Sequence, residues 1–98
     1  MTFNRENMTL VLKEIEKNIS FQGSDLSNPQ DWNFKIDLPV EDIIKCSPNE
    51  SDKIRYVIKI FETLEYITFE NGNYSVIHYI TNKGIKFLFS ELHNIEFI

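Results

Sequence analysis

The sequence is poor in glycine, proline and cysteine, and it contains no long run of apolar residues. Only 3 Gly and 3 Pro occur in 98 residues, whereas 42% of the residues are hydrophobic, which favours a packed core over a disordered chain. The apolar runs span only a few residues, and this excludes a membrane-spanning helix. The chain starts with polar residues such as Asn4, Arg5 and Glu6, so we expect no secretory signal. At this length we expect one domain over residues 1–98.

A single cysteine, Cys46, is present, so the chain cannot form an internal disulfide. This usage favours a reducing compartment, and we expect a cytoplasmic protein. We interpret Cys46 as a small buried hydrophobic residue rather than a reactive thiol.

Positive charge is also in deficit. Lys and Arg number 10 against 15 Asp and Glu, which gives a net charge of −5 and an isoelectric point near 4.9. Nearly all of the excess lies in residues 21–50, where two lysines face six carboxylates. The whole molecule is therefore not attracted to a polyanion, and any such contact requires a local basic patch.

The first half of the chain shows two kinds of periodicity. Apolar residues at helical spacing predict a helix from about Glu6 to Asn18, and a stretch rich in Ser, Asn, Gly and Pro over 20–30 predicts a loop. Alternating apolar residues over 32–38 predict a half-buried strand that ends at Pro39. Residues 40–45 predict a short second helix.

The second half predicts a long helix, a hairpin and a closing helix. Ser47 is expected to cap the long helix and to form a capping box with Glu50. The expected buried arc of this helix consists of Ile54, Val57, Ile58, Phe61 and Leu64. Asn71-Gly72 is a strong signal for a two-residue turn, and it predicts three cross-strand pairs: Phe69 with Tyr74, Thr68 with Ser75, and Ile67 with Val76. Thr81 is expected to cap the closing helix.

Two passages of this half resemble the winged-helix superfamily. The passage from Arg55 to Ile67 is similar to its third helix running into the first wing strand, and Tyr79 to Leu88 contains its Thr-x-x-Gly-x-x-x-Leu pattern. The resemblance implies an α+β winged helix-turn-helix fold: three N-terminal helices with a short strand, a two-stranded β-hairpin wing and a C-terminal helix. Small winged-helix proteins of phages and mobile elements have this size and layout. The chain departs from the family where Glu65 or Tyr66 replaces the usual Gly, and in a wing tip (70–73) without Lys or Arg.

The resemblance implies binding of double-stranded DNA and a role in transcription regulation. In this family the third helix enters the major groove. The matching candidates on the open face of the helix are Lys53, Arg55, Tyr56, Lys59 and Thr63. Glu50 and Asp52 stand at the end of the helix that approaches DNA, and they oppose this role. An ordinary solvated helix face is the competing interpretation.

A second set of residues suggests a protein partner. Several apolar residues fall outside the expected buried arcs: Leu10, Phe87, Ile95, Phe97 and Ile98. They favour a homodimer seam, although the tail can also fold back over its own core. The alternative to DNA binding is an acidic interaction module, such as a phage-type inhibitor or adaptor, that binds a basic protein partner.

Nothing in the sequence favours an enzyme or a cofactor. His78 and His93 lack Cys, Asp or Glu at metal-ligand spacing, so we interpret them as structural or surface residues and expect no metal. No nucleophile elbow and no Gly-rich phosphate loop occur, and the acidic residues of 25–50 are scattered rather than paired.

Overall fold

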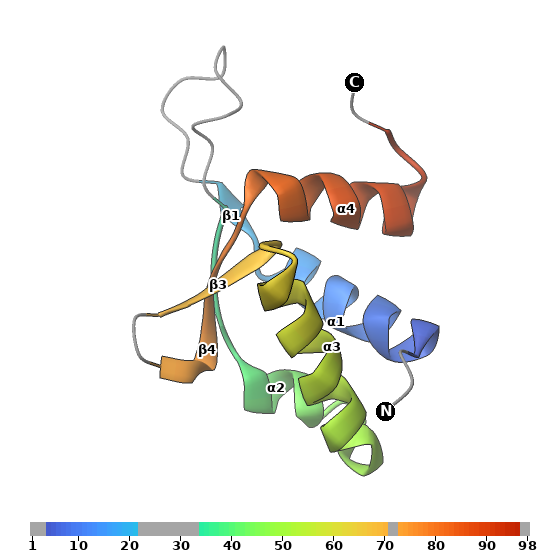
Figure 1. Cartoon of the computed structure of the whole chain (residues 1–98), viewed down its shortest axis with the longest axis vertical. Coiled ribbons are helices and arrows are strands. Elements are labelled where there is room, and N and C mark those ends of the chain that lie inside the picture. Colours follow the sequence, from blue (N-terminus) through green and yellow to red (C-terminus); the bar gives the residue numbers. More distant parts are fainter. Residues whose placement is uncertain (1–3, 22–33, 71–72, 97–98) are drawn as a thin grey trace.

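The computed structural model describes residues 4–21, 34–70 and 73–96, and it has an α+β fold (Figure 1). In chain order the elements are α1 (Arg5–Lys17), β1 (Ser20–Phe21), β2 (Phe34–Pro39), α2 (Val40–Ile44), the 3₁₀ turn η2 (Pro48–Glu50), α3 (Ser51–Thr63), β3 (Ile67–Glu70), β4 (Asn73–Ile80) and α4 (Asn82–His93). The strands form one antiparallel sheet in the order β1-β2-β4-β3. Helices α1, α3 and α4 gather beside this sheet, and α2 lies at the far end of β2 (Figure 1).

Helix α1 forms where the spacing of apolar residues predicts it. The side chain of Asn4 caps the helix, because its Oδ1 accepts hydrogen bonds from the backbone N–H groups of Glu6 (2.8 Å) and Asn7 (3.2 Å). One face of α1 is buried against α3 and α4. The capping role of Asn4 explains why the helix begins at Arg5.

Strand β2 confirms the alternation read from the sequence. Phe34, Ile36 and Leu38 are buried, and Lys35 and Asp37 are more exposed. Of the predicted loop over 20–30, Ser20 and Phe21 instead form β1, which pairs with Lys35 and Phe34. The rest of that loop and Trp32 lie outside the described residues.

The start of α3 differs from the predicted capping box. Ser47 makes no side-chain cap; its carbonyl accepts the N–H of Glu50 at 3.0 Å, which closes the turn η2. Glu50 therefore precedes a helix that begins at Ser51, and its carboxylate pairs with Lys53 instead. The capping box is wrong because the proline segment forms a 3₁₀ turn of its own.

The predicted register between β3 and β4 is also wrong. Phe69 pairs with Ile77, Thr68 with Tyr79, and Ile67 with Ile80, with irregularities on both sides of Phe69. A four-residue strand pairs here with an eight-residue strand, so β4 accommodates the extra residues as bulges. As a result Ile77 and Ile80 are buried, whereas Tyr74 is 67% exposed. The connecting residues Asn71 and Gly72 lie outside the described residues.

Between α3 and β3 the chain makes a reverse turn in which a non-glycine residue has a left-handed backbone conformation. Glu65 has φ 64°, and the N–H of Tyr66 donates to the carbonyl of Phe61 at 2.8 Å while the N–H of Glu65 donates to that of Glu62 at 2.9 Å. This is the Schellman arrangement in which glycine is usual. Of Glu65 and Tyr66, it is Glu65 that adopts the left-handed conformation, at some conformational cost.

Helix α4 is anchored to the same turn. Thr81 caps α4 as predicted, because its Oγ1 accepts the N–H of Gly84 at 3.0 Å. The Thr81 hydroxyl also lies within hydrogen-bonding distance of the carbonyls of Glu65 (2.7 Å) and Tyr66 (3.1 Å). A Cβ on Gly84 would lie 2.1 Å from the carbonyl oxygen of Tyr66, so only glycine fits this approach.

One hydrophobic core joins these elements. Its buried side chains come from every described helix of five or more residues and from β2, β3 and β4. The central members, with at most 1% of their surface exposed, are Val11, Ile15, Ile43, Ile54, Val57, Phe61, Ile77, Ile80 and Leu88. Four of the five residues of the arc predicted in α3 are buried. The exception is Leu64, which lies at the edge of the arc after the last helical residue and is 42% exposed.

Candidate functional site

The structure separates the predicted DNA-contact residues onto two sides of α3. Arg55 and Lys59 lie together on the side that faces α2 and strands β3 and β4. Tyr56 lies on the side that faces α1 and α4, where it is partly buried. Neighbouring helix residues point about 100° apart, which accounts for this division. Tyr56 therefore lines a different groove from Arg55 and Lys59, although Lys59, three residues later, is its neighbour on the helix surface.

Each cation predicted to contact DNA is paired with a carboxylate of the chain. Arg55 Nη2 lies 2.7 Å from Glu41 Oε1 of α2, and Lys59 Nζ lies 2.6 Å from Glu62 Oε1 one turn later. Lys53 Nζ lies 3.2 Å from Glu50 Oε2. The hydrogen bond and the charge of Glu62 raise the pKa of the Lys59 ammonium. These cations are already partly neutralised.

Thr63, the remaining candidate, uses its hydroxyl within the helix. Thr63 Oγ1 donates to the carbonyl of Lys59 at 2.9 Å. The oxygen can still accept a hydrogen bond, but a phosphate offers no donor at neutral pH.

Arg55 and Lys59 line a groove between α3 and the sheet, which we call the strand groove. Its other lining residues are Val40, Ile58, Phe69 and Tyr74, and its volume is about 280 Å³. The rings of Phe69 and Tyr74 lie 5.3 Å apart, and Lys59 Nζ stands 5.7 Å from the centre of the Tyr74 ring. The strand groove therefore combines an apolar interior with a rim of cations and their carboxylate partners.

The segment that contains α2 and α3 is slightly acidic. From Val40 to Thr63 the chain carries four cations, Lys45, Lys53, Arg55 and Lys59, against five carboxylates, Glu41, Asp42, Glu50, Asp52 and Glu62. Asp52 is exposed and forms no ion pair with a described residue. This excess of one carboxylate does not favour the approach of a phosphate backbone.

The other side of α3 borders a second and more apolar groove, which we call the helix groove. It lies between α1, α3 and α4, has a volume of about 540 Å³ and is lined by Met8, Tyr56, Ile60, Phe61, Leu64 and Phe87. Arg5 and Glu91 stand at its edge, with Arg5 Nη2 3.4 Å from Glu91 Oε2. Phe87 forms its wall, stacked on Tyr66 with ring centres 4.6 Å apart and 5.8 Å from Phe61.

Of the residues predicted for a dimer or partner interface, Phe87 is the one that lines the helix groove. Leu10 is partly buried and packs against the core. Ile95 is 45% exposed beyond the end of α4, beside Lys86 and Phe87. Phe97 and Ile98 lie outside the described residues. Phe87 and Ile95 therefore lie side by side, and Leu10 lines neither the helix groove nor the recess beside Ile95.

Each of the two histidines contacts one carboxylate. His78 lies in the bulged part of β4, with Nδ1 2.7 Å from Oδ1 of Asp37, whose backbone is left-handed at φ 43°. Hydrogen bonding to His78 lowers the pKa of the Asp37 carboxyl, and Lys35 at 3.2 Å adds to this effect. His93 Nε2 lies 2.6 Å from Glu16 Oε2. The bulge in β4 puts Ile77, rather than His78, on the buried face that Ile80 shares.

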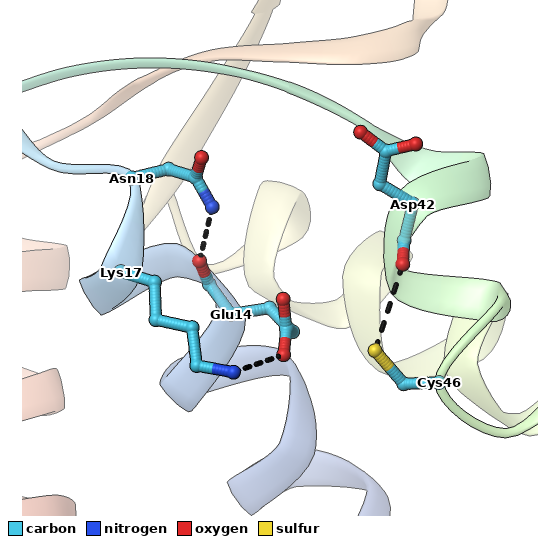
Figure 2. Close-up of polar contacts among 5 residues, drawn as sticks. All are labelled: Glu14, Lys17, Asn18, Asp42 and Cys46. Carbon is cyan, nitrogen blue, oxygen red and sulfur yellow. Dashed lines mark hydrogen bonds and ion pairs between the residues drawn. The ribbon is translucent and has the colours of Figure 1, made fainter.

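Cys46 is exposed, so the expectation of a buried residue is wrong. Figure 2 shows its thiol beyond the end of α2, where Sγ donates to the carbonyl of Asp42 at 3.6 Å. Partial burial raises the pKa of the Cys46 thiol, and the nearby Glu14, which is paired with Lys17 at 3.0 Å, adds to this effect. A raised pKa reduces the thiolate fraction, so Cys46 lacks the activation of a nucleophile.

Within the residues that the structure describes, no three His, Cys, Asp or Glu side chains come together in a way that holds a metal ion. No described helix is long and apolar enough to cross a membrane.

Sequence reasoning missed the acidic partners of the cations and the residues of the helix groove. The spacing of Lys59 and Glu62 is a signal that could have revealed one pair. The pairing of Arg55 with Glu41 depends on how α2 packs against α3, and no local pattern encodes it. Likewise, Arg5 and Glu91 are 86 residues apart and meet only in the folded chain.

Comparison with known proteins adds no family to this description. No protein-family model matches the chain, and no curated protein or solved structure matches it.

Proposed function

We propose that this chain is a non-enzymatic winged-helix protein that binds a basic protein partner through the strand groove. The winged-helix interpretation is supported by α3 lying beside β3 and β4, and by Thr81 and Gly84 joining α4 to the turn before β3. The observation that carries the choice of a protein ligand is the pairing of Lys53, Arg55 and Lys59 with carboxylates. A helix that reads DNA needs cations free to reach phosphates and bases.

The strand groove supplies two features that a protein ligand uses. Its apolar interior, built by Val40, Ile58, Phe69 and Tyr74, accepts one apolar side chain. Glu41, whose side chain is 63% exposed, can exchange its partner Arg55 for a Lys or Arg residue that flanks that apolar side chain, and Asp52, one turn before Arg55, forms no ion pair with a described residue. The ligand that fits is a basic segment with an aromatic or large aliphatic residue.

The test is a fluorescence-anisotropy titration with short labelled peptides. We expect binding of a peptide in which one phenylalanine is flanked by lysines, and weaker binding when serine replaces the phenylalanine or glutamates replace the lysines. Replacement of Glu41 and Glu62 by Gln should weaken binding of the basic peptide by roughly three- to tenfold, because two exposed attractions are lost. Replacement of Arg55 and Lys59 by Ala should strengthen it, because two repulsive charges are removed.

A matched pair of variants locates the binding surface. Tyr74→Ser removes an exposed wall of the strand groove and should reduce affinity for the basic peptide. Leu64→Ser removes an exposed apolar residue on the other side of α3 and should leave that affinity unchanged. Equal affinity for the lysine and glutamate peptides, or equal effects of the two variants, would contradict the proposal.

Binding of double-stranded DNA is the second candidate, and one observation favours it. Arg55 and Lys59 lie on the same side of α3, next to the strands that correspond to a wing. Exposed ion pairs contribute only about 0.2–1 kcal/mol each, so a phosphate can displace a carboxylate at small cost. If DNA is the ligand, affinity for a duplex falls steeply with salt, and replacement of Arg55 and Lys59 by Ala abolishes it.

A further inference from the structure

The helix groove is an apolar recess that combines exposed hydrophobic residues with a cation and an anion at its edge. Its floor is rigid, because Met8 and Phe61 belong to the core and Phe87 is held between Tyr66 and Phe61. On the edge, Leu64 exposes 42% of its surface, and Tyr56 and Ile60 are only partly buried. Residues of three helices therefore leave an apolar surface uncovered within the described chain.

The composition of this surface fits a second copy of itself. A two-fold interface must be self-complementary, with every projection matched by a recess on the same surface. Here Leu64 projects beside the recess that is walled by Phe87. A second copy turned by 180° can place its Leu64 into that recess and receive the first copy's Leu64 in return.

The charges at the edge of the helix groove are also self-complementary. Arg5 and Glu91 are one cation and one anion at the edge of the helix groove. Their contact within one chain is long, at 3.4 Å, and the Arg5 side chain is 82% exposed, so this ion pair is weakly held. Across a two-fold axis each Arg5 can meet the Glu91 of the other copy. The two intramolecular pairs of the two chains are then replaced by two pairs across the interface.

We infer that the chain forms a homodimer in which the helix grooves of two copies face each other, with Leu64 as the apolar anchor and Arg5 and Glu91 as reciprocal ion pairs. This arrangement leaves the strand groove of each copy free, because that groove lies on the opposite side of α3. It does not depend on the proposed basic partner, so either proposal can fail while the other holds.

The first test is the mass of the full chain in solution, measured by sedimentation equilibrium across a concentration series. We expect the mass to rise from 11.6 kDa towards twice that value as concentration increases. Leu64→Ser and Leu64→Glu should each raise the dimer dissociation constant at least tenfold, while circular dichroism shows an unchanged fold. Tyr74→Ser, which alters an exposed aromatic residue of the strand groove, should dimerise like the wild type.

The second test uses charge reversal and mixing. Arg5→Glu alone places two carboxylates opposite each other at both contacts, and Glu91→Arg alone places two cations there, so each variant should be more monomeric than the wild type. An equimolar mixture of the two variants restores an attractive pair at both contacts, so the heterodimer should recover the wild-type affinity. An ion pair confined to one chain cannot produce this recovery.

Two results would overturn the inference. One is a mass of 11.6 kDa at every concentration for the wild type. The other is a dimer that Leu64→Glu leaves intact, or whose charge-reversed variants gain nothing on mixing, because the interface then lies elsewhere.

Discussion

The two sides of α3 differ in the number of ion pairs and in the size of the apolar groove that they border. Towards the sheet, Arg55 and Lys59 are held by Glu41 and Glu62 over a small apolar groove. Towards α1 and α4, the helix presents Ile60 and Leu64 beside a larger apolar groove with one weak ion pair at its edge. One amphipathic helix thus borders two candidate surfaces that differ in charge and in apolar area.

The difference shows that charged residues counted along a helix do not reveal which of them are paired with a neighbouring residue. Three cations in seven residues, Lys53, Arg55 and Lys59, are a favourable pattern for a DNA-reading helix. Their carboxylate partners make this pattern less favourable for DNA binding, because a phosphate must displace a carboxylate that then remains nearby. The neighbours of each cation in space are therefore as informative as the cation itself.

The largest change in stability is expected where α4 contacts the turn after α3. Gly84→Ala places a Cβ 2.1 Å from the carbonyl oxygen of Tyr66, so α4 must move away from the turn after α3. We expect a loss of unfolding free energy at the upper end of about 1–3 kcal/mol, the range for overpacking. Urea denaturation measures it, with Lys86→Ala, an exposed change in the same helix, expected within about 0.5 kcal/mol of the wild type. Equal stabilities for the two variants would show that the close approach is not required.

A smaller change in the free energy of unfolding, of opposite sign, is expected at the turn between α3 and β3. Glu65 holds a left-handed backbone at φ 64°, which costs a non-glycine residue about 1–2 kcal/mol. Glycine adopts this conformation freely but loses more entropy on folding, so Glu65→Gly should stabilise the chain by about 0.5–1 kcal/mol. Glu65→Asn should give a smaller gain. A destabilised glycine variant in urea denaturation would contradict a strained turn.

The smallest effect is expected in the sheet, away from both grooves. The depressed pKa of the Asp37 carboxyl means that its contribution to stability is present above the ordinary value of 3.8 and is lost as the pH falls through the lower folded value. Asp37→Asn keeps a residue that tolerates the left-handed backbone, but it removes the charge that faces His78. Thermal unfolding should therefore show the wild type as more stable at mildly acidic pH, with the difference vanishing at strongly acidic pH.

The same variant serves as a control for the comparison of the grooves. Asp37→Asn should change neither the affinity for the basic peptide nor the dimer dissociation constant. A constant stability difference across the acidic range would contradict the assignment of the low pKa to Asp37.

Local patterns in the sequence predict much of the fold. Apolar spacing in α1 and α3, alternation in β2 and the cap at Thr81 depend on neighbouring residues, so they can be read without a structure. The register of β3 and β4 cannot, because bulges let Ile77 and Ile80 face the core three residues apart. Here the burial of large side chains outweighs the strict two-residue period of an ideal strand.

The candidate sites were less predictable, because they depend on distant pairs. The cations of α3 could be identified by type, but the sequence does not reveal that Glu41 binds Arg55 from another helix. The exposure of Leu64 follows from the end of α3 and the turn at Glu65, which is a property of the backbone rather than of the apolar pattern. The strand groove arises only when α2, α3, β3 and β4 are packed together, and the helix groove only when α1, α3 and α4 are.

The most direct test of the paired cations is a titration of labelled duplex DNA at low salt with two forms of the protein. We predict that the wild type leaves the duplex free at concentrations at which it binds the basic peptide. We predict that the variant with Gln at positions 41 and 62 binds the duplex, with an affinity that falls as salt rises, because Arg55 and Lys59 are then released. Wild-type binding with a steep salt dependence, abolished by Ala at 55 and 59, would contradict the account and identify α3 as a DNA-binding helix.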